Sequence, residues 1–137
     1  MIVYDVLVGL STMHLPRALN ACTAPDDKRS CGLSEQPKEV QDVQAWLGAR
    51  PVEWLLENMD VDQKWCLIHA THMTEKETVD LAASGAVAGL CPITEANLGD
   101  GPFNGPAYLN AGGRFGLGSD SNVRISLTEE FRTLEYS

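Results

Sequence analysis

Three short apolar segments of the sequence are each followed by polar side chains that could do chemistry. A histidine, His69, lies near the end of WCLIHA (65–70), and Asp120 lies just beyond RFGLG (114–118). Between them, the polar segment TEANLGDG (94–101) follows a third apolar run. Imidazole and carboxylate groups are ligands of catalytic zinc, and they also transfer protons. If the apolar segments are parallel strands, their carboxyl ends share one edge, and we predict a catalytic or metal-binding site there.

Each of these residues also has a purely structural interpretation. His69 alone could be a hydrogen-bonded histidine in a packed loop, and Asp120 alone could form a turn or cap a helix. Glu95, in the polar segment, could be only a turn former. The adjacent Glu129 and Glu130 most simply support a helix N-terminus through the helix dipole. The occurrence of polar groups after three successive apolar segments favours the functional interpretation of His69 and Asp120.

The elements that would position these residues alternate regularly from about residue 37 onward. Apolar residues at helical spacing predict helices, and Thr74 followed by Glu77 has the spacing of a capping box. Short apolar runs bounded by polar residues predict buried strands. The predicted order is helix 38–47 ended by Gly48, a helix from Pro51, strand 65–70, a helix from Thr74 to Gly85, strand 86–91, loop 94–101, a short helix 106–111, strand 114–118 and a final helix capped by Ser126.

This alternation predicts an α/β fold with parallel strands, covered on both faces or forming a barrel wall. The first 36 residues are less regular. The segment IVYDVLVGL could be a strand, but DDKRSCGLSEQ (26–36) is too polar and too interrupted by glycine for a buried strand. We therefore divide the chain into an irregular segment, 1–36, and a regular α/β segment, 37–137.

The composition indicates which partners the protein is expected to bind and in which cellular compartment it is expected to lie. Ten basic and nineteen acidic residues give the 137-residue chain a formal net charge of −9, which disfavours nucleic acid as a partner. No run of 18 apolar residues is present and the N-terminus makes a poor signal peptide, so we expect no membrane span. The four cysteines form no CxxC pair, and Cys66 and Cys91 lie in apolar runs. This pattern indicates buried thiols and a cytoplasmic protein.

Three longer segments resemble one known family. They are WCLIHATH, SGAVAGLCPITEANLGDG and GGRFGLGSDSNVRISLTEEFRTLEYS, and from about Glu35 onward the chain resembles the formimidoylglutamate deiminases of the amidohydrolase superfamily. The resemblance implies a metal-dependent (β/α)8 TIM-type barrel, of which this chain would form the C-terminal half. It also implies hydrolysis of N-formimino-L-glutamate to N-formyl-L-glutamate and ammonia in histidine degradation. The nearest alternatives are another deaminase or a chlorohydrolase-like amidohydrolase.

The same resemblance implies roles for particular residues. Asp120, in GSDS, matches an aspartate ligand of zinc. His69, in CLIHATH, matches a histidine that helps to hold the attacking hydroxide. Glu35, in SEQPKEV, matches a glutamate that carries a proton from the metal-bound water to the leaving nitrogen. His14 and Arg17, in MHLPRAL, resemble residues that hold the carboxylates of the substrate, a task that suits arginine.

The sequence departs from the family pattern where further metal ligands are expected. A ligand histidine should stand at the position of Gly32, and the HxH pair of the first barrel strand has no counterpart. One carboxylate and one imidazole fall short of the three protein ligands of a catalytic zinc. A (β/α)8 barrel needs about 250 residues, so the chain is roughly half of one. We therefore expect a truncated, inactive fragment that lacks an N-terminal half or forms a homo-oligomer. The alternative is a non-catalytic α/β remnant or scaffold.

Overall fold

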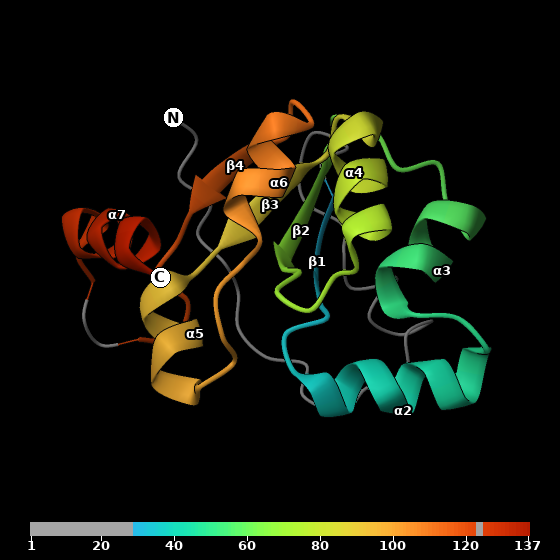
Figure 1. Ribbon diagram of the computed structural model, residues 1–137, viewed down its shortest axis with the longest axis horizontal. Helices are drawn as coiled ribbons and strands as arrows, with labels where there is room; N and C mark the ends of the chain where they lie inside the picture. The colour runs from blue at the N-terminus through green and yellow to red at the C-terminus, as the bar shows by residue number, and fades with distance from the viewer. Residues whose placement is uncertain (1–28, 123–124) are drawn as a thin grey trace.

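Four parallel strands form one sheet in the part of the chain that the structure describes. A computed structural model describes residues 29–122 and 125–137 (Figure 1). The strands are β1 (Arg29–Leu33), β2 (Trp65–His69), β3 (Val87–Leu90) and β4 (Arg114–Leu117), and they lie in the sheet in their chain order. Each strand is parallel to the next, so all four carboxyl ends lie at one edge. The expected α/β fold with parallel strands is confirmed.

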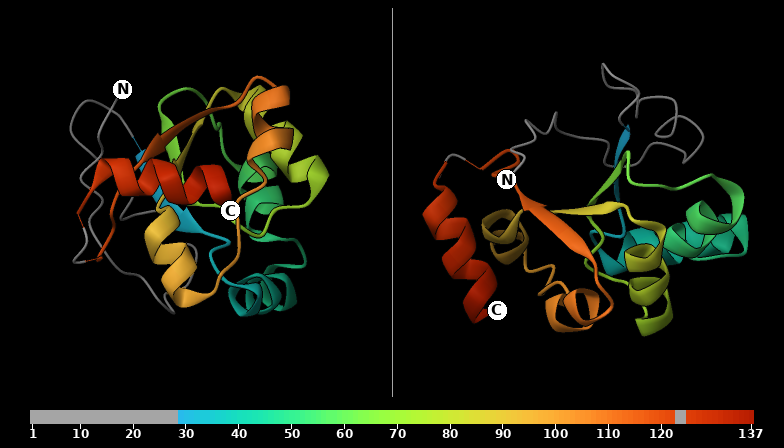
Figure 2. Two further views of the ribbon diagram at one scale, coloured as in Figure 1. Left: turned by 60° about the vertical axis from the view of Figure 1, so that its left-hand side comes forward. Right: turned by 90° about the horizontal axis from the view of Figure 1, so that it is seen from above.

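Five helices connect the consecutive strands of the described sheet, and a sixth, α7, follows β4. They are α2 (Pro37–Leu47), α3 (Pro51–Asn58), α4 (Glu75–Ser84), α5 (Pro92–Leu98), α6 (Gly105–Asn110) and α7 (Leu127–Tyr136). The connection from β1 to β2 contains α2 and α3, the next contains α4, and the third contains α5 and α6. The view from above in Figure 2 shows α4 and α6 on the same side of the sheet. Parallel strands require such crossovers, because a tight turn cannot return the chain to the starting edge.

The helices begin and end at residues suited to the task. The Thr74 hydroxyl accepts a hydrogen bond from the Glu77 amide at 3.2 Å, and the Glu77 carboxylate accepts one from the Thr74 amide at 2.7 Å. This reciprocal pair is the predicted capping box of α4. At the other end of α4, Gly85 has a φ of 80°, a conformation that favours glycine. Ser126 caps α7 by accepting from the Glu129 amide at 3.4 Å, as its spacing predicts.

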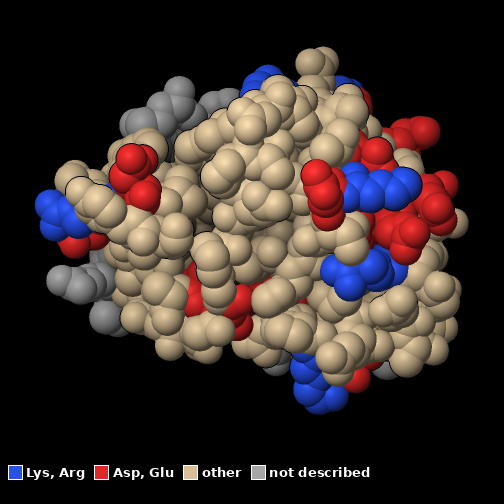
Figure 3. All heavy atoms as spheres, viewed as in Figure 1, with Lys and Arg blue, Asp and Glu red and all other residues tan. Residues whose placement is uncertain are grey.

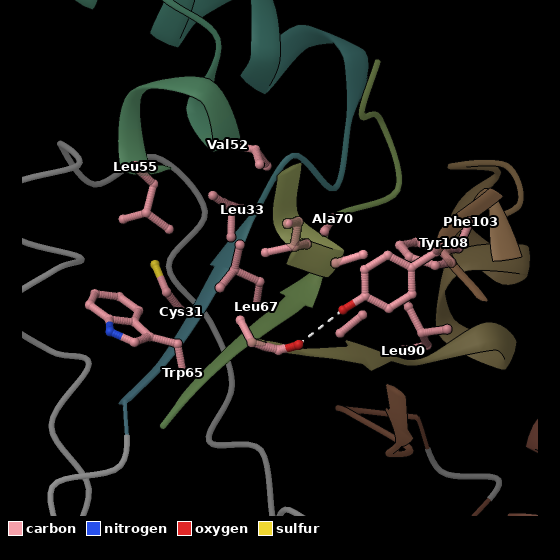
Figure 4. Close-up of a cluster of buried hydrophobic side chains, with 14 of the residues drawn as sticks. Cys31, Leu33, Val52, Leu55, Trp65, Leu67, Ala70, Leu90, Phe103 and Tyr108 are labelled. Atoms are coloured by element: carbon pink, nitrogen blue, oxygen red, sulfur yellow. Dashed lines mark hydrogen bonds between the residues drawn. The ribbon is translucent and has the colours of Figure 1, made fainter. Parts of the chain in front are cut away.

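The main hydrophobic core fills the space between the sheet and helices α3, α4 and α6 (Figure 4). Leu67, in the middle of β2, is fully buried there, and shortening such a side chain to alanine costs about 2–5 kcal/mol. The buried Tyr108 of α6 adds hydrogen bonds between this helix and the ends of the strands. Its hydroxyl hydrogen-bonds with the Ala86 carbonyl at 3.0 Å, drawn as a dashed line in Figure 4, and with the Arg114 carbonyl at 3.2 Å.

A second, smaller cluster lies on the other face of the sheet, because alternate residues of a strand point to opposite faces. It consists of Cys66, Ile68 and Cys91, with Val87 packed against it. Gly89 of β3 faces this cluster, and a Cβ on it would lie 2.9 Å from the Cys66 sulfur. Only glycine therefore fits beside Cys66. Both cysteines of the cluster are free and buried, which confirms the prediction made for them.

The prediction that residues 26–36 contain no buried strand is wrong. Residues Arg29–Leu33 form β1, and Cys31 and Leu33 are 3% and 1% exposed. Gly32 between them is exposed. A strand that buries only alternate residues needs no continuous apolar run, so the polar composition of the segment was misleading. Strand β1 is stabilised by pairing with β2, and this pairing cannot be predicted from the sequence of the segment alone.

The prediction of a loop over 94–101 is also wrong for most of that segment. Helix α5 begins at Pro92 and ends at Leu98. Proline favours the first position of a helix, because it fixes φ and lacks the amide hydrogen that would go unpaired there. Gly99 then ends the helix with a φ of 75°. The glycines and the asparagine of the segment suggested a loop, although they mark only its end.

Charged groups are unevenly distributed over the face drawn in Figure 3. Acidic and basic side chains gather over α3 and α4, where Lys76 pairs with Asp80 at 2.6 Å. The surface over α6 carries few charges in the same view. Within the described ranges, the helices are all too short or too polar to cross a membrane.

Candidate active site

Two carboxylates approach the two ring nitrogens of His69 at the carboxyl edge of the sheet. His69 is the last residue of β2, Glu35 follows the end of β1, and Glu95 lies in α5 after β3. The Glu95 Oε1 atom lies 3.2 Å from His69 Nδ1, and the Glu35 Oε1 atom lies 3.7 Å from His69 Nε2. His69 and Glu95 are buried, whereas Glu35 is half-buried. Three neighbouring strand ends thus contribute one side chain each to a single cluster.

Glu95 is held in place by its own helix. Its Oε1 atom accepts a hydrogen bond from the Cys91 amide at 3.0 Å, at the beginning of α5. The same oxygen approaches His69 Nδ1. A carboxylate at Nδ1 holds the ring proton on that nitrogen, so the other nitrogen, Nε2, is directed toward Glu35. Glu95 therefore orients the His69 ring and favours the tautomer with the proton on Nδ1.

The backbone at the strand ends adopts an uncommon conformation. Among residues 29–122 and 125–137, four non-glycine residues have a positive φ: Ser34 (55°), His69 (66°), Ala70 (47°) and Asp120 (50°). The left-handed conformation costs a non-glycine residue about 1–2 kcal/mol. Two hydrogen bonds hold the neighbouring loops in this form, from the Ala70 amide to the Leu33 carbonyl at 3.0 Å and from the His72 amide to the Ser34 carbonyl at 2.9 Å. Such strained positions occur preferentially at functional sites.

Burial and neighbouring charges change the pKa values of this cluster. Burial is the largest influence on Glu35 and raises the pKa of its carboxyl, and the charge of Asp120 adds to that effect. Burial acts to lower the pKa of His69, but the hydrogen bond to Glu95 and the charge of Glu35 outweigh it. The pKa of His69 is therefore raised above its ordinary value, again with a contribution from Asp120. Asp120 thus acts on both groups through its charge.

The directions of these pKa shifts favour a role in proton transfer. A histidine with a raised pKa keeps its proton longer, and a carboxyl with a raised pKa accepts one more readily. With Glu35 near one ring nitrogen and Glu95 at the other, the cluster can hold a proton and pass it to a reacting group. This is general acid–base chemistry at the edge where parallel α/β proteins bind their substrates.

Several buried polar atoms near this edge have no hydrogen-bond partner among the described residues. They are Ser34 Oγ, Thr71 Oγ1, His72 Nε2 and Asp100 Oδ2, and they lie in the loops that follow β1, β2 and α5. Buried polar atoms are nearly always paired in folded proteins. A polar ligand or ordered water at this edge would pair them.

The structure brings together two of the residues predicted from the sequence. Glu35 and His69 are neighbours at the carboxyl edge, and Asp120 influences both through its charge. Their catalytic roles remain predictions. His14 and Arg17, expected to bind the substrate, lie outside the described residues.

Glu95 joins this cluster although the sequence interpretation allowed it to be only a turn former. The signal that could have identified it is its place in the first turn of a helix opened by Pro92, where a glutamate side chain can reach back to the preceding amide. That arrangement exists only if the segment is a helix. The wrong loop prediction therefore hid the role of Glu95.

The described residues do not by themselves fit a metal centre. Among them, no group of three or more histidine, cysteine, aspartate or glutamate side chains could hold a metal ion. Gly32, which stands where the resemblance implies a ligand histidine, is exposed, and a Cβ built on it meets nothing within 4 Å. The position thus has room for a larger side chain, but the chain places none there.

The same fold occurs within larger proteins of known structure. An amidohydrolase from Brucella melitensis matches 82% of this chain with a TM-score of 0.79 and 59% sequence identity. An adenosine deaminase from Xanthomonas campestris with bound zinc matches 79% of it with a TM-score of 0.73 and 28% identity. The chain therefore has the fold of part of an amidohydrolase.

The sequence comparison is more specific. Over 104 residues, or 76% of its length, the chain is 60% identical to formimidoylglutamate deiminase from Pseudomonas aeruginosa. It is 32% identical over 103 residues to a 5-methylthioadenosine/S-adenosylhomocysteine deaminase from Bacillus cereus. No protein family model matches the chain. The resemblance to formimidoylglutamate deiminase is confirmed, and the matched region spans 23% to 25% of the length of these relatives and of the Brucella protein.

Proposed function

We propose that this chain carries part of the active site of a hydrolase that cleaves a carbon–nitrogen bond in N-formimino-L-glutamate. The observation that carries the proposal is the convergence of Glu35 and Glu95 on His69 at the carboxyl ends of three adjacent strands. The 60% identity to a formimidoylglutamate deiminase supports this substrate in preference to the nucleosides acted on by the less similar deaminases. The products would be N-formyl-L-glutamate and ammonia.

The reaction needs one water molecule and two proton movements. The water oxygen forms a bond to the formimino carbon, the bond from that carbon to the terminal nitrogen breaks, and the nitrogen leaves as ammonia. Glu35 would take the two protons of the water in turn and deliver each to the terminal nitrogen, a role that its raised pKa favours, and the water oxygen stays on the carbon as the formyl oxygen. His69, oriented by Glu95, would hold the attacking oxygen and stabilise the developing negative charge.

We assign no step to a metal, because the described residues lack a set of ligands for one. Asp120 is proposed as one ligand of a zinc ion, by analogy with relatives whose structures contain zinc. The remaining ligands would have to come from elsewhere. A separate chain with the missing strands, or a second copy of this chain, could provide them, because β1 and β4 are the edge strands of the described sheet.

The isolated chain is therefore expected to have little or no deiminase activity. The direct test measures ammonia released from N-formimino-L-glutamate by the purified chain with added zinc. Background release is the expected result. Turnover at the rate of a complete deiminase would contradict the conclusion that this chain has too few metal ligands to be active alone.

A chimera tests whether the site residues are competent. Residues 29–137 would replace the matching segment of the Pseudomonas aeruginosa relative, with and without a Gly32→His change. We expect ammonia release only from the chimera with Gly32→His, and loss of that release when Glu35→Gln is added. A folded, zinc-loaded Gly32→His chimera without activity would contradict the proposed function.

The second candidate function is a non-catalytic scaffold that retains the βα units. The glycine at position 32 is the observation that favours it. This position is exposed and has open space for a larger side chain, but it carries no side chain that could bind a metal. Metal analysis separates the two candidates. Stoichiometric zinc in the purified chain supports a working site, whereas its absence, together with an inactive Gly32→His chimera, supports the scaffold.

A further inference from the structure

A buried carboxylate in the last helix contacts the first turn of α5, which carries Glu95. Glu130 of α7 is 1% exposed, and its Oε2 atom accepts a hydrogen bond from the Ile93 amide at 2.9 Å. The two residues are 37 positions apart in the chain. Glu130 lies in the first turn of α7, as its sequence position predicts, and its carboxylate also reaches the N-terminus of a second helix, α5.

Helix α5 depends on this contact for its N-terminus. The first amides of a helix have no partner within it, and Cys91, at the N-cap position, provides no side-chain hydrogen bond. Pro92 has no amide hydrogen, so Ile93 is the first donor of the helix, and Glu130 satisfies it. Helices shorter than about 12 residues are marginal on their own, so α5, with seven residues, relies on tertiary contacts.

We infer that Glu130 is a positioning residue that fixes the first turn of α5, and so holds Glu95 against Nδ1 of His69. The path has three hydrogen-bonded steps: Glu130 to the Ile93 amide, Glu95 to the Cys91 amide, and Glu95 to His69. The importance for catalysis rests on the proposed function. The structural claim does not, because it concerns the ring of His69 in the chain itself.

The test uses the ring nitrogens of His69 in the full chain. Histidine labelled with ¹⁵N reports by NMR which ring nitrogen carries the proton, and the chain has three histidines, assigned through His14→Gln and His72→Gln variants. The measurement is made above the pKa of His69, where the ring is neutral. In the unaltered chain we expect the proton on Nδ1, beside Glu95.

Two variants separate the position of the oxygen from the charge. Glu130→Gln keeps an acceptor oxygen in place and removes the charge, so we expect the tautomer to be unchanged. Glu130→Asp keeps the charge and withdraws the oxygen by about 1.5 Å, the length of one carbon–carbon bond. We expect it to move the proton from Nδ1 to Nε2. Glu135→Gln, at an exposed position of the same helix, is the control for net charge.

The other outcomes overturn the inference. If neither variant changes the tautomer, Glu130 only stabilises the packing of α7. If Glu130→Gln changes it and Glu130→Asp does not, charge rather than placement controls His69. Should Glu130→Asp fail to fold by circular dichroism, Glu130→Asn withdraws the oxygen without the charge, and the same tautomer change is expected. If neither Glu130→Asp nor Glu130→Asn folds, Glu130 is needed for the stability of the fold and is not a positioning residue for His69. None of these outcomes depends on turnover, so a failure of the proposed enzymatic function remains distinguishable.

Discussion

The Oε1 atom of Glu95 lies 3.2 Å from Nδ1 of His69, and both side chains are buried. The two residues come from different βα units, 26 positions apart in the chain. Their contact therefore depends on the parallel pairing of β2 with β3 and on the helix that follows β3. A buried imidazole beside a buried carboxylate gives this edge of the sheet its capacity for acid–base chemistry.

Replacing Glu95 by glutamine is expected to lower the pKa of His69. The hydrogen bond to Glu95 and its charge both raise the pKa of the ring, so their loss removes two of the influences that oppose the lowering effect of burial. The measurement is an NMR titration of the His69 ring signals. Glu135→Gln removes an exposed charge of the same sign and should leave the pKa of His69 unchanged. An unaltered value in Glu95→Gln would show that the contact contributes nothing to the proton affinity of His69.

The chain is expected to be more stable at mildly acidic pH than above neutrality. The pKa values of Glu35 and His69 are raised in the folded state, so these groups bind protons more tightly there than in the unfolded chain. Stability from such groups is complete below their ordinary pKa values, 4.5 and 6.5, and is lost as pH rises through the raised folded values. The Tm should therefore fall as pH rises from about 5 to about 8.

A variant at position 35 shows how much of this pH dependence of the Tm comes from Glu35. Glu35→Gln cannot titrate at that position, so its Tm should vary less across the same range. Equal slopes for both proteins would mean that Glu35 does not contribute.

Tyr108→Phe is expected to destabilise the chain by about 1–2 kcal/mol. The change removes the hydroxyl that bonds to the carbonyls of Ala86 and Arg114, and leaves both of these acceptors with one partner fewer. Urea denaturation measures the free energy of unfolding. Tyr136→Phe removes the same hydroxyl at a position that is 84% exposed and should have no measurable effect. Equal stabilities of the two variants would argue against the buried hydrogen bonds.

Two glycines of the sheet should respond in opposite ways to alanine. Gly89→Ala places a Cβ 2.9 Å from the Cys66 sulfur and should cost about 1–3 kcal/mol. Gly32→Ala places a Cβ in open space on an exposed position and should change stability by less than about 0.5 kcal/mol. Thermal unfolding of both variants, measured side by side, checks the contrast. A larger loss in Gly32→Ala than in Gly89→Ala would contradict the packing of this face.

The regular part of the fold could be predicted because its signals are local. The capping pair Thr74 and Glu77, the stop at Gly85 and the apolar run of β2 each act within a few residues. The order of these elements then implied a parallel sheet. Segment β1 was missed because its stability comes from pairing with Trp65–His69, more than thirty positions away.

The candidate site was only partly predictable for the same reason. His69 and Asp120 stand at strand ends, which the sequence pattern marks, and Glu35 was identified by its resemblance to a family motif. The carboxylates of Glu95 and Glu130 act through contacts to other elements. Glutamates are common on exposed helix surfaces, so residue type alone did not distinguish these two from their neighbours, and the place of Glu95 after Pro92 is informative only when the segment is recognised as a helix.

The buried sulfur of Cys66 provides an intrinsic reporter of how often the smaller cluster on its face of the sheet opens to solvent. Burial raises the pKa of this thiol to about 11, so at neutral pH it is shielded and almost entirely protonated. Alkylating reagents attack the thiolate. Their rate of labelling at Cys66 therefore measures how often its cluster with Ile68 and Cys91 opens to solvent, without any introduced probe.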